Sequence, residues 1–303
     1  MREGRLARLA IVVEDVMLLP ATMSCSFAQS NELCYFMHMK RRAENARQYV
    51  EGLARSGRYF FSSGDARAAL GVSAEATKVA LHRLSQQGLV SSPARGYYVV
   101  VPPEYHAIGC LPAEQFVPSL MERLGLHYYA GLLTAAQYHG AAHQKPQEFQ
   151  VCLERARRPL TCSRVRVAFI VRKRLGDVPV QSVNTPRGTL LISTPEATAL
   201  DLIGYPHRAG GLNQVATVLG ELAERLDADK LVAVADTAPP AWSQRLGYVL
   251  ERVDAAEKAA PLKAWVQAHA HKAAVLLAGA KSSSGPPDKG WKIVVNASVE
   301  PDL

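Results

Sequence analysis

The sequence predicts an α+β protein in which an N-terminal winged helix-turn-helix precedes a mixed α/β domain with a C-terminal helical part. Residues 40–105 show three short helical patterns, each closed by a glycine, and then a hairpin pattern. Residues 106–303 begin with strand and helix patterns, and apolar spacings of three and four dominate residues 211–270. A closing strand is expected at about 290–297, and residues 1–39 remain as an N-terminal extension.

Composition narrows the class of protein. Of the 303 residues, 48% are apolar and 20% are charged, which is typical of a globular chain. No stretch approaches the roughly 18 uninterrupted apolar residues that a membrane span needs, so a membrane protein is excluded at this stage. The five cysteines form no CxxC pair, which argues against a disulfide framework or a zinc knuckle and favours the cytoplasm.

The net charge of +8 favours a polyanionic partner. The basic excess lies in the first two-thirds of the chain. Residues 40–105 and 106–180 each carry 10 basic and 5 acidic side chains, whereas residues 181–303 carry 12 and 13. We therefore expect nucleic-acid binding in the first part and a scaffold or protein-partner role in the last.

The extreme N-terminus resembles an export signal only superficially. Arginines precede an apolar stretch, but Glu14 and Asp15 interrupt it where a signal peptide needs a continuous apolar core. Met37 and Met39 stand immediately before the first helical pattern. We therefore expect residues 1–39 to be an upstream extension that does not pack, with the true start codon left open.

Glycine and serine delimit the first two predicted helices. The helix that begins near Lys40 ends at Gly57, because glycine accepts the left-handed conformation of a helix end. A short strand, YFFSS, follows. Ser62 or Ser63 then caps a second helix, which ends at Gly71.

A third helix and a hairpin complete the predicted winged helix-turn-helix. Ser73 is the expected N-cap, and Gly88 ends the helix before an apolar strand. The face expected to be buried carries Thr77, Ala80, Leu81 and Leu84. The opposite, polar face carries Glu75, Lys78, His82 and Gln86. Pro93, Arg95 and Gly96 form the turn of the hairpin, and its return strand runs to Val101.

This arrangement suits duplex DNA, because the major groove admits an α-helix. Lys78, His82 and Gln86 are the expected contacts to base edges or phosphates, and Arg95 would reach an adjacent groove or the backbone. Glu75 would accept a hydrogen bond from cytosine or favour the positive helix end. The expected phosphate ligands are Arg41, Arg42 and Arg83. The alternative is that the polar face is only a solvated helix surface.

The second domain contains distinctive short sequence motifs. The specific elements are Tyr128-Tyr129, Ala135-Ala136, His139-Gly140, His143-Gln144 and Ser193-Thr194-Pro195-Glu196. With these elements the chain closely resembles the AbiEi-type antitoxins over about residues 40–296. The resemblance implies a winged helix that represses its own operon through operator DNA, and a C-terminal domain that counters a nucleotidyltransferase-like toxin. It leaves open whether the toxin is bound directly and whether a homodimer forms on the DNA.

Without the family, the same residues have mainly structural interpretations. His139 and His143 lie four residues apart, but no third metal ligand is near and Gly140 weakens the helix between them, so no metal or cofactor is expected. Ser193 or Thr194 caps a helix with Pro195 in its first turn. Asp201 is the only acid on the following turn, and a lone carboxylate is more often paired than catalytic.

The strongest charge feature is a run without acidic residues at 155–174. Its basic residues are Arg155, Arg157, Arg158, Arg164, Arg166, Arg172, Lys173 and Arg174. The run contains a strand in which Val165, Val167, Phe169 and Val171 alternate with Arg164, Arg166, Ala168 and Ile170. One face of the strand would therefore enter a core, and the other face would be cationic at its N-terminal end. The run is then either a charge-protected sheet edge or a polyanion or partner surface.

The final third predicts a small helical bundle. Pro239-Pro240 and Pro261 are expected at early helix positions, and the strand that Trp291 opens would return to the sheet of the second domain. No nucleophile elbow, phosphate loop, HExxH helix or dinucleotide turn occurs, so no catalytic residue is assigned and an enzyme is not expected.

The leading hypothesis is therefore a cytoplasmic antitoxin that represses its own operon. Two alternatives remain open. In one, residues 106–303 form a small-molecule sensor attached to a winged-helix repressor. In the other, the basic run belongs to an RNA- or tRNA-binding factor.

Overall fold

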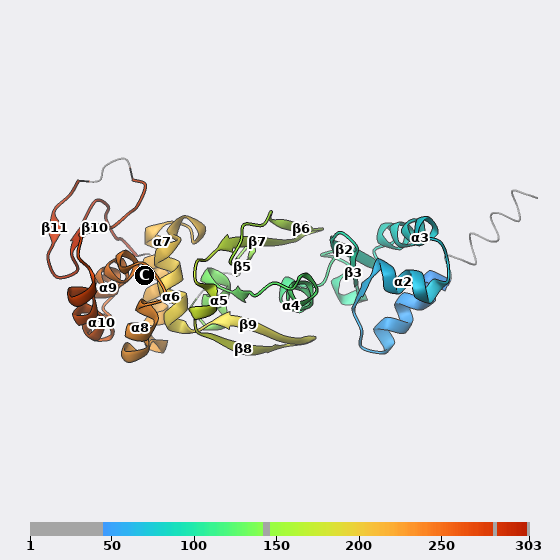
Figure 1. The fold of residues 1–303 in the computed structure, drawn as a ribbon, viewed down its shortest axis with the longest axis horizontal. Coiled ribbons are helices and arrows are strands. Elements are labelled where there is room, and N and C mark those ends of the chain that lie inside the picture. The colour runs from blue at the N-terminus through green and yellow to red at the C-terminus, as the bar shows by residue number, and fades with distance from the viewer. Residues whose placement is uncertain (1–44, 142–145, 281–283, 302–303) are drawn as a thin grey trace, which may run out of the picture. The chain divides into compact units, whose positions relative to one another are not determined.

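The computed structural model describes residues 45–141, 146–280 and 284–301. The predicted extension at 1–39, the predicted phosphate ligands Arg41 and Arg42, and His143 lie outside these residues. Within the described ranges the protein has a mixed α+β fold (Figure 1). No helix among the described residues combines the length and the apolar character needed to cross a membrane.

The first part contains three helices and a small antiparallel sheet. Residues 45–55 are helical. The elements that follow are β1 (Phe60–Ser62), α2 (Ser63–Leu70), α3 (Ala74–Gln86), β2 (Val90–Ala94) and β3 (Tyr97–Val100). The strands lie in the order β1-β3-β2, and both pairs are antiparallel. Apolar side chains of all these elements form one core, which includes Val50, Leu81 and Val100.

The predicted boundaries of α2 and α3 are confirmed by their caps. Ser62 Oγ accepts a hydrogen bond from Asp65 N at 3.0 Å, and Asp65 Oδ2 accepts one from Ser62 N at 2.8 Å. This reciprocal capping box fixes the start of α2 and holds the pKa of Asp65 below its usual range. Gly71 ends α2 at a φ of 61°, where glycine is favoured. Ser73 Oγ then accepts from Ala76 N at 3.2 Å and begins α3.

The predicted hairpin forms, but its tip is not a free loop. The carbonyl oxygen of Gly96 accepts hydrogen bonds from Ser63 N at 3.2 Å and from Arg123 Nη2 at 3.4 Å. Tyr97 is buried in a core that it shares with Phe116 of the second part. The turn is thus tied to α2 and to the helix that carries Arg123, while the Arg95 side chain is exposed.

A six-stranded mixed sheet organises the second part. Two helices flank it, α4 (Ala113–Leu124) and α5 (Leu132–Tyr138). The strands are β4 (Tyr129–Ala130), β5 (Phe149–Leu153), β6 (Leu160–Cys162), β7 (Val165–Val171), β8 (Val180–Thr185) and β9 (Gly188–Ser193). Their order is β6-β7-β5-β4-β9-β8, with β5/β7 and β4/β9 parallel and the other pairs antiparallel (Figure 1).

Strand β7 has apolar cores on both of its faces, which corrects the expected alternation. Val167 and Phe169 pack into the core that contains α4, as predicted. Ala168 and Ile170, expected on the cationic face, are buried in the core on the other side of the sheet. Val171, expected to be buried, is 41% exposed. The strand is covered on both sides, so the expected alternation holds only at its N-terminal end.

The C-terminal part is a helical bundle, as predicted. Its helices are α6 (Pro195–Gly204), α7 (Leu212–Leu222), α8 (Ala228–Ala235), α9 (Pro240–Arg252) and α10 (Ala256–His269). Thr194 is the N-cap of α6, with Pro195 in the first turn. Gly247 of α9 allows Trp291 to approach the helix, because an added Cβ would lie 2.0 Å from the indole ring. Buried side chains of all five helices share one core.

Two predictions in this part are wrong. Helix α10 begins at Ala256, so Pro261 lies inside it rather than at an early position. The closing strand β12 (Ile293–Val294) does not return to the six-stranded sheet. It pairs with β10 (Ala274–Val275) and β11 (Pro287–Asp288) in a small sheet of its own.

A buried ion pair joins the central sheet to this bundle. Arg172 Nε lies 2.8 Å from Asp201 Oδ1 of α6, and the two side chains are only 2% and 0% exposed. Tyr129 Oη donates to Asp201 Oδ2 at 2.6 Å. Arg172 also donates to the carbonyl and the hydroxyl of Thr237, at 2.9 and 3.2 Å. Asp201 is therefore a paired structural carboxylate, as the sequence suggested.

We expect Arg172→Met to lower the free energy of unfolding by about 3–5 kcal/mol, because it leaves the Asp201 carboxylate buried without a cation. Urea denaturation monitored by circular dichroism measures this loss. The control is Arg47→Met, which removes a solvent-exposed pair with Glu51 and should cost less than about 1 kcal/mol. Similar losses for the two variants would contradict a structural role for the buried pair.

Candidate nucleic-acid interface

Helix α3 presents the polar face that the sequence predicted. Thr77, Leu81 and Leu84 are buried against the rest of the first part. The predicted contact residues on the other side are all exposed: Glu75, Lys78, His82 and Gln86. The burial of the opposite stripe fixes this orientation, so the four side chains share one accessible face.

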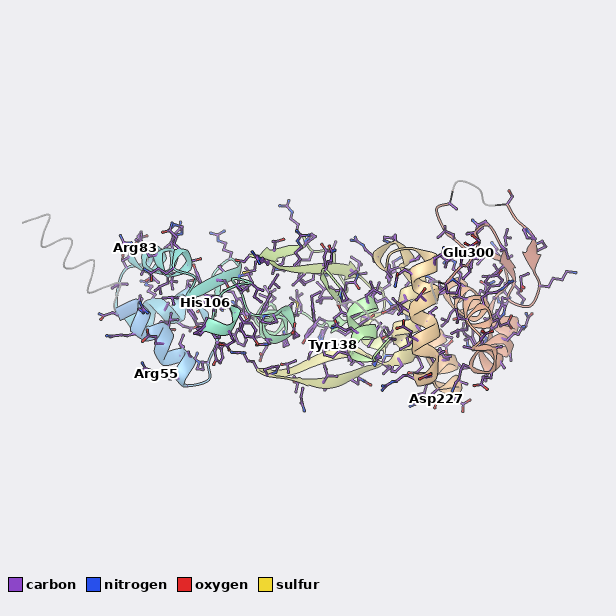
Figure 2. All side chains as sticks on the ribbon, turned by 180° about the vertical axis from the view of Figure 1, so that it is seen from behind. Arg55, Arg83, His106, Tyr138, Asp227 and Glu300 are labelled. Carbon is purple, nitrogen blue, oxygen red and sulfur yellow. The ribbon has the colours of Figure 1, made fainter. Side chains whose placement is uncertain are left out.

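Arg83 differs from the other predicted ligands. It is half-buried on α3 (Figure 2) and already has an interaction partner within the protein. A phosphate contact by Arg83 would therefore compete with that interaction. Its assignment as a phosphate ligand remains a prediction.

The polar face of α3 also contains an apolar residue that the sequence reading missed. Val79 is 46% exposed, the largest value among the large apolar residues that the structure describes. It lies four residues after Glu75 and three before His82, so all three share a helix face. The sequence contained a signal for this exposure, because the helical spacing places Val79 on a different face of α3 from Thr77, Leu81 and Leu84.

The basic run at 155–174 is not one surface. Arg155, Arg157 and Arg158 lie in the loop after the C-terminal end of β5. Arg164 and Arg166 lie at the opposite, N-terminal end of β7, where Arg164 N donates to Ile108 O at 3.2 Å. The Arg157 guanidinium lies over the Phe169 ring, 5.7 Å from its centroid, in the C-terminal half of β7. The run is therefore not one continuous polyanion or partner surface, which was one of its two interpretations.

The last three basic residues of the run differ again. Arg172 is buried in the ion pair with Asp201, so its assignment to a surface is wrong. Arg174 is exposed, but it bonds Asp177 Oδ2 at 2.7 Å and Asp236 O at 2.6 Å. Lys173 is exposed at the same end of β7. Charge alone could not reveal this division, because it depends on the path of the strand.

An unpredicted arginine connects the second part to the first. Arg187 lies in the two-residue turn between β8 and β9. Its guanidinium stacks over the Tyr59 ring, 3.9 Å from the centroid. It also hydrogen-bonds the Gln115 side chain and lies 3.5 Å from Glu104 Oε1. The turn of the sheet is thus fixed to residues beside the β1 strand and the following connector.

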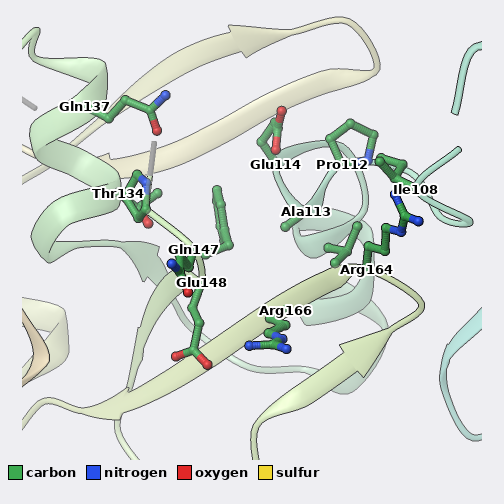
Figure 3. Close-up of a pocket in the computed structure, with 13 residues that line it drawn as sticks. Ile108, Pro112, Ala113, Glu114, Thr134, Gln137, Gln147, Glu148, Arg164 and Arg166 are labelled. Atoms are coloured by element: carbon green, nitrogen blue, oxygen red, sulfur yellow. The ribbon is translucent and has the colours of Figure 1, made fainter. Parts of the chain in front are cut away.

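A cavity of about 200 Å³ opens between α4, α5 and the start of β7 (Figure 3). Four charged side chains line it: Glu114, Glu148, Arg164 and Arg166. Thr134 and Gln137 contribute polar groups from α5. Among the described residues, no ion pair links any of the four charged side chains to another group. The cavity therefore combines an apolar lining with charged groups of both signs.

His139 is a buried structural histidine. Its Nε2 donates a hydrogen bond to Ser193 O at 2.8 Å, and burial lowers its pKa. The described residues contain no group of three or more His, Cys, Asp or Glu side chains that would hold a metal ion. The histidine therefore joins α5 to the strand that precedes α6.

Comparison with protein families agrees with this organisation. A family model described as the AbiEi antitoxin C-terminal domain matches residues 129–252, and a model described as a transcriptional regulator, AbiEi antitoxin, matches residues 48–101. The chain belongs to the AbiEi antitoxin family. More than half of it lies inside the two matched ranges, and these contain α3 and the Arg172–Asp201 pair.

Membership of this family identifies the chain as a DNA-binding regulator of the toxin–antitoxin type. The fold of this AbiEi antitoxin is similar to the crystal structure of the RV2827C protein from Mycobacterium tuberculosis. The TM-score is 0.59 at 18% sequence identity, over 82% of this chain and 90% of that chain. At this identity the likeness concerns the fold alone. The comparison with curated proteins gives no significant match.

The lowered pKa of His139 predicts a pH dependence of stability. Because the folded pKa lies below the unfolded value of about 6.5, the histidine favours folding above that pH, and the contribution is lost as the pH falls. We expect His139→Gln to lose less stability than the parent between about pH 8 and pH 5.5. Urea denaturation at both pH values measures the difference. His271→Gln, at an exposed position, should behave as the parent. If the parent and His139→Gln show the same pH dependence of stability, His139 is not its cause.

Proposed function

We propose that residues 45–101 of this AbiEi antitoxin form a winged helix-turn-helix that represses its own operon. The observation that carries the proposal is the accessible face of α3, which is held outward by the buried side chains of Thr77, Leu81 and Leu84. The helix order and the β1-β3-β2 sheet support the same motif. An α-helix with one exposed polar face fits the major groove of B-DNA.

Within this proposal the exposed side chains of α3 have separate roles. Lys78, His82 and Gln86 contact base edges or phosphates, and Glu75 accepts a hydrogen bond from a cytosine amino group. Arg95 contacts the backbone from the hairpin turn, where its side chain is exposed. The thiols of Cys110, Cys152 and Cys162 are free and buried, which supports a reducing compartment, the cytoplasm.

We further propose that the second part counters a nucleotidyltransferase-like toxin. The family match over residues 129–252 supports this role. The nearly balanced charge of residues 181–303, 12 basic against 13 acidic side chains, suits a protein partner better than nucleic acid. The divided basic run gives no comparable support to an RNA-binding factor.

The DNA half of the proposal predicts the behaviour of a double variant. Lys78→Ala with His82→Ala should weaken binding to the DNA upstream of the gene by more than about tenfold, because two groove contacts are lost. A mobility-shift titration at fixed salt measures the affinity. The matched control is His271→Ala with Lys272→Ala, which removes the same residue types at exposed positions in the C-terminal part. Equal affinities for parent and α3 variant would contradict the assigned recognition helix.

The toxin half predicts a separation of the two activities in the full chain. When antitoxin and toxin are expressed from unrelated promoters, the Lys78→Ala, His82→Ala variant should rescue growth as well as the parent, because repression no longer matters. Growth curves during toxin induction measure the rescue. If the variant is present at parental levels and fails to rescue, neutralisation requires DNA binding and the two-part assignment is wrong.

A small-molecule sensor is the second candidate function, and the cavity in Figure 3 favours it. Carboxylates and guanidiniums that line one cavity of about 200 Å³ suit a small zwitterion such as an amino acid. Operator affinity measured with each common amino acid tests this. A shift in affinity that Arg166→Ala abolishes would support the sensor, and constant affinity would exclude amino-acid effectors.

A further inference from the structure

Val79 occupies the middle of the exposed face of α3. Glu75 and His82 adjoin it along the helix, and Lys78 precedes it. A single exposed apolar residue on a protein surface is ordinary and needs no explanation. Here, however, the residue lies among the side chains assigned to base contacts, and it is the most exposed large apolar residue that the structure describes.

The side chains around Val79 determine how closely a partner can approach it. Ala76 lies three residues before it on α3, and its side chain does not extend beyond Cβ. Lys78 and Gln86 are long and flexible, so they can reach to either side. The N-terminal turns of α3 therefore present a small, partly apolar surface that is bordered by long polar side chains. Recognition helices place this end nearest the base edges.

We propose that Val79 is a specificity-determining residue that packs against the 5-methyl group of a thymine in the major groove. This inference rests on the proposed DNA-binding function of α3. Thymine is the only standard base that presents a methyl group in that groove. A valine opposite a cytosine amino group or a guanine carbonyl would leave a polar group desolvated without a hydrogen-bond partner. The same contact therefore favours thymine and disfavours the other bases.

The size of the effect follows from the apolar surface involved. Burial of one methyl group favours binding by about fourfold. Removing either partner of the contact, the thymine methyl or the valine methyls, should weaken binding by about that factor. Removing both should cost little more than removing one, because the contact is lost only once.

The experiment uses the full chain and a random-sequence duplex library. The parent selects its preferred duplex from the library, and each thymine of the selected core is then replaced singly by uracil, which lacks only the methyl group. Affinities are measured for the parent, Val79→Ala and Val180→Ala. Alanine is a better helix former than valine, so α3 is retained in Val79→Ala. Val180 is a control of the same residue type, 42% exposed on β8.

The expected result is one thymine at which uracil weakens parental binding about fourfold. Val79→Ala should bind the thymine duplex about fourfold more weakly and should not distinguish thymine from uracil there. Val180→Ala should behave as the parent. The inference is overturned if the selected core lacks thymine, if no replacement by uracil weakens parental binding, or if Val79→Ala keeps the parental discrimination.

Two variants separate this inference from the function on which it rests. If Lys78→Ala with His82→Ala weakens binding to the selected duplex and Val79→Ala does not, α3 is the recognition helix and only the methyl contact is wrong. If neither variant weakens binding, or if the parent selects no sequence, the proposed DNA interface itself is wrong.

Discussion

The buried contact between Arg172 and Asp201 is the constraint on which the arrangement of the second part depends. An ionised pair removed from water is tolerated only when its remaining donors and acceptors are also satisfied. Here Tyr129 on β4 bonds one carboxylate oxygen, and Thr237 after α8 accepts from the guanidinium. Four separate segments must therefore meet at one point. A shift of the bundle over the sheet would leave at least one buried charge unsatisfied, so the network specifies the position of the bundle as well as stabilising it.

Arg187 performs a related task at the other end of the sheet. Its contacts with Tyr59, Gln115 and Glu104 link the β8–β9 turn to the first part, and the guanidinium is almost fully covered. Tyr97 adds an apolar contact, because its ring lies in the same core as Phe116. The part that carries α3 is thus joined to the sheet by specific contacts rather than by the connector alone.

Local features of the fold could be predicted from the sequence because their causes are local. Ser62, Ser73 and Thr194 cap helices within three residues of themselves, and Gly71 ends α2 through its own conformation. The polar face of α3 followed from spacing within thirteen residues. The basic run, by contrast, left two interpretations open, a charge-protected sheet edge or a polyanion or partner surface. The fold places Arg155, Arg157 and Arg158 in the loop after β5 and buries Arg172 in an ion pair with Asp201. That burial could not be predicted, because Asp201 lies 29 residues further along the chain.

Other features depended on distant contacts that spacing cannot show. Cys110 and Cys162 are far apart in sequence, yet their thiols are hydrogen-bonded and Ser91 Oγ donates to Cys110 Sγ at 3.2 Å. The hydrogen bond from Cys110 holds the pKa of the Cys162 thiol below its usual range. Pro261 was expected to begin a helix because proline lacks an N–H, but Ala256 begins α10 one turn earlier. The short β12 strand finds partners in its own small sheet.

The face of α3 shows why the candidate site was only partly predictable. Polar residues are expected on the exposed face of a helix. The sequence therefore predicted that face of α3 from Glu75, Lys78, His82 and Gln86. Apolar residues are usually buried, and its residue type alone was no reason to place Val79 among the exposed polar side chains. Its exposure became visible only when Thr77, Leu81 and Leu84 had fixed the rotation of the helix. On a surface that binds DNA, a short apolar group demands closer approach than a lysine does. Long polar side chains can adapt to many sequences, whereas a valine held on a rigid helix has few rotamers with which to adapt. Under the proposed DNA-binding function of α3, the residue that departs from the polar pattern is therefore the one best suited to sense a single base pair.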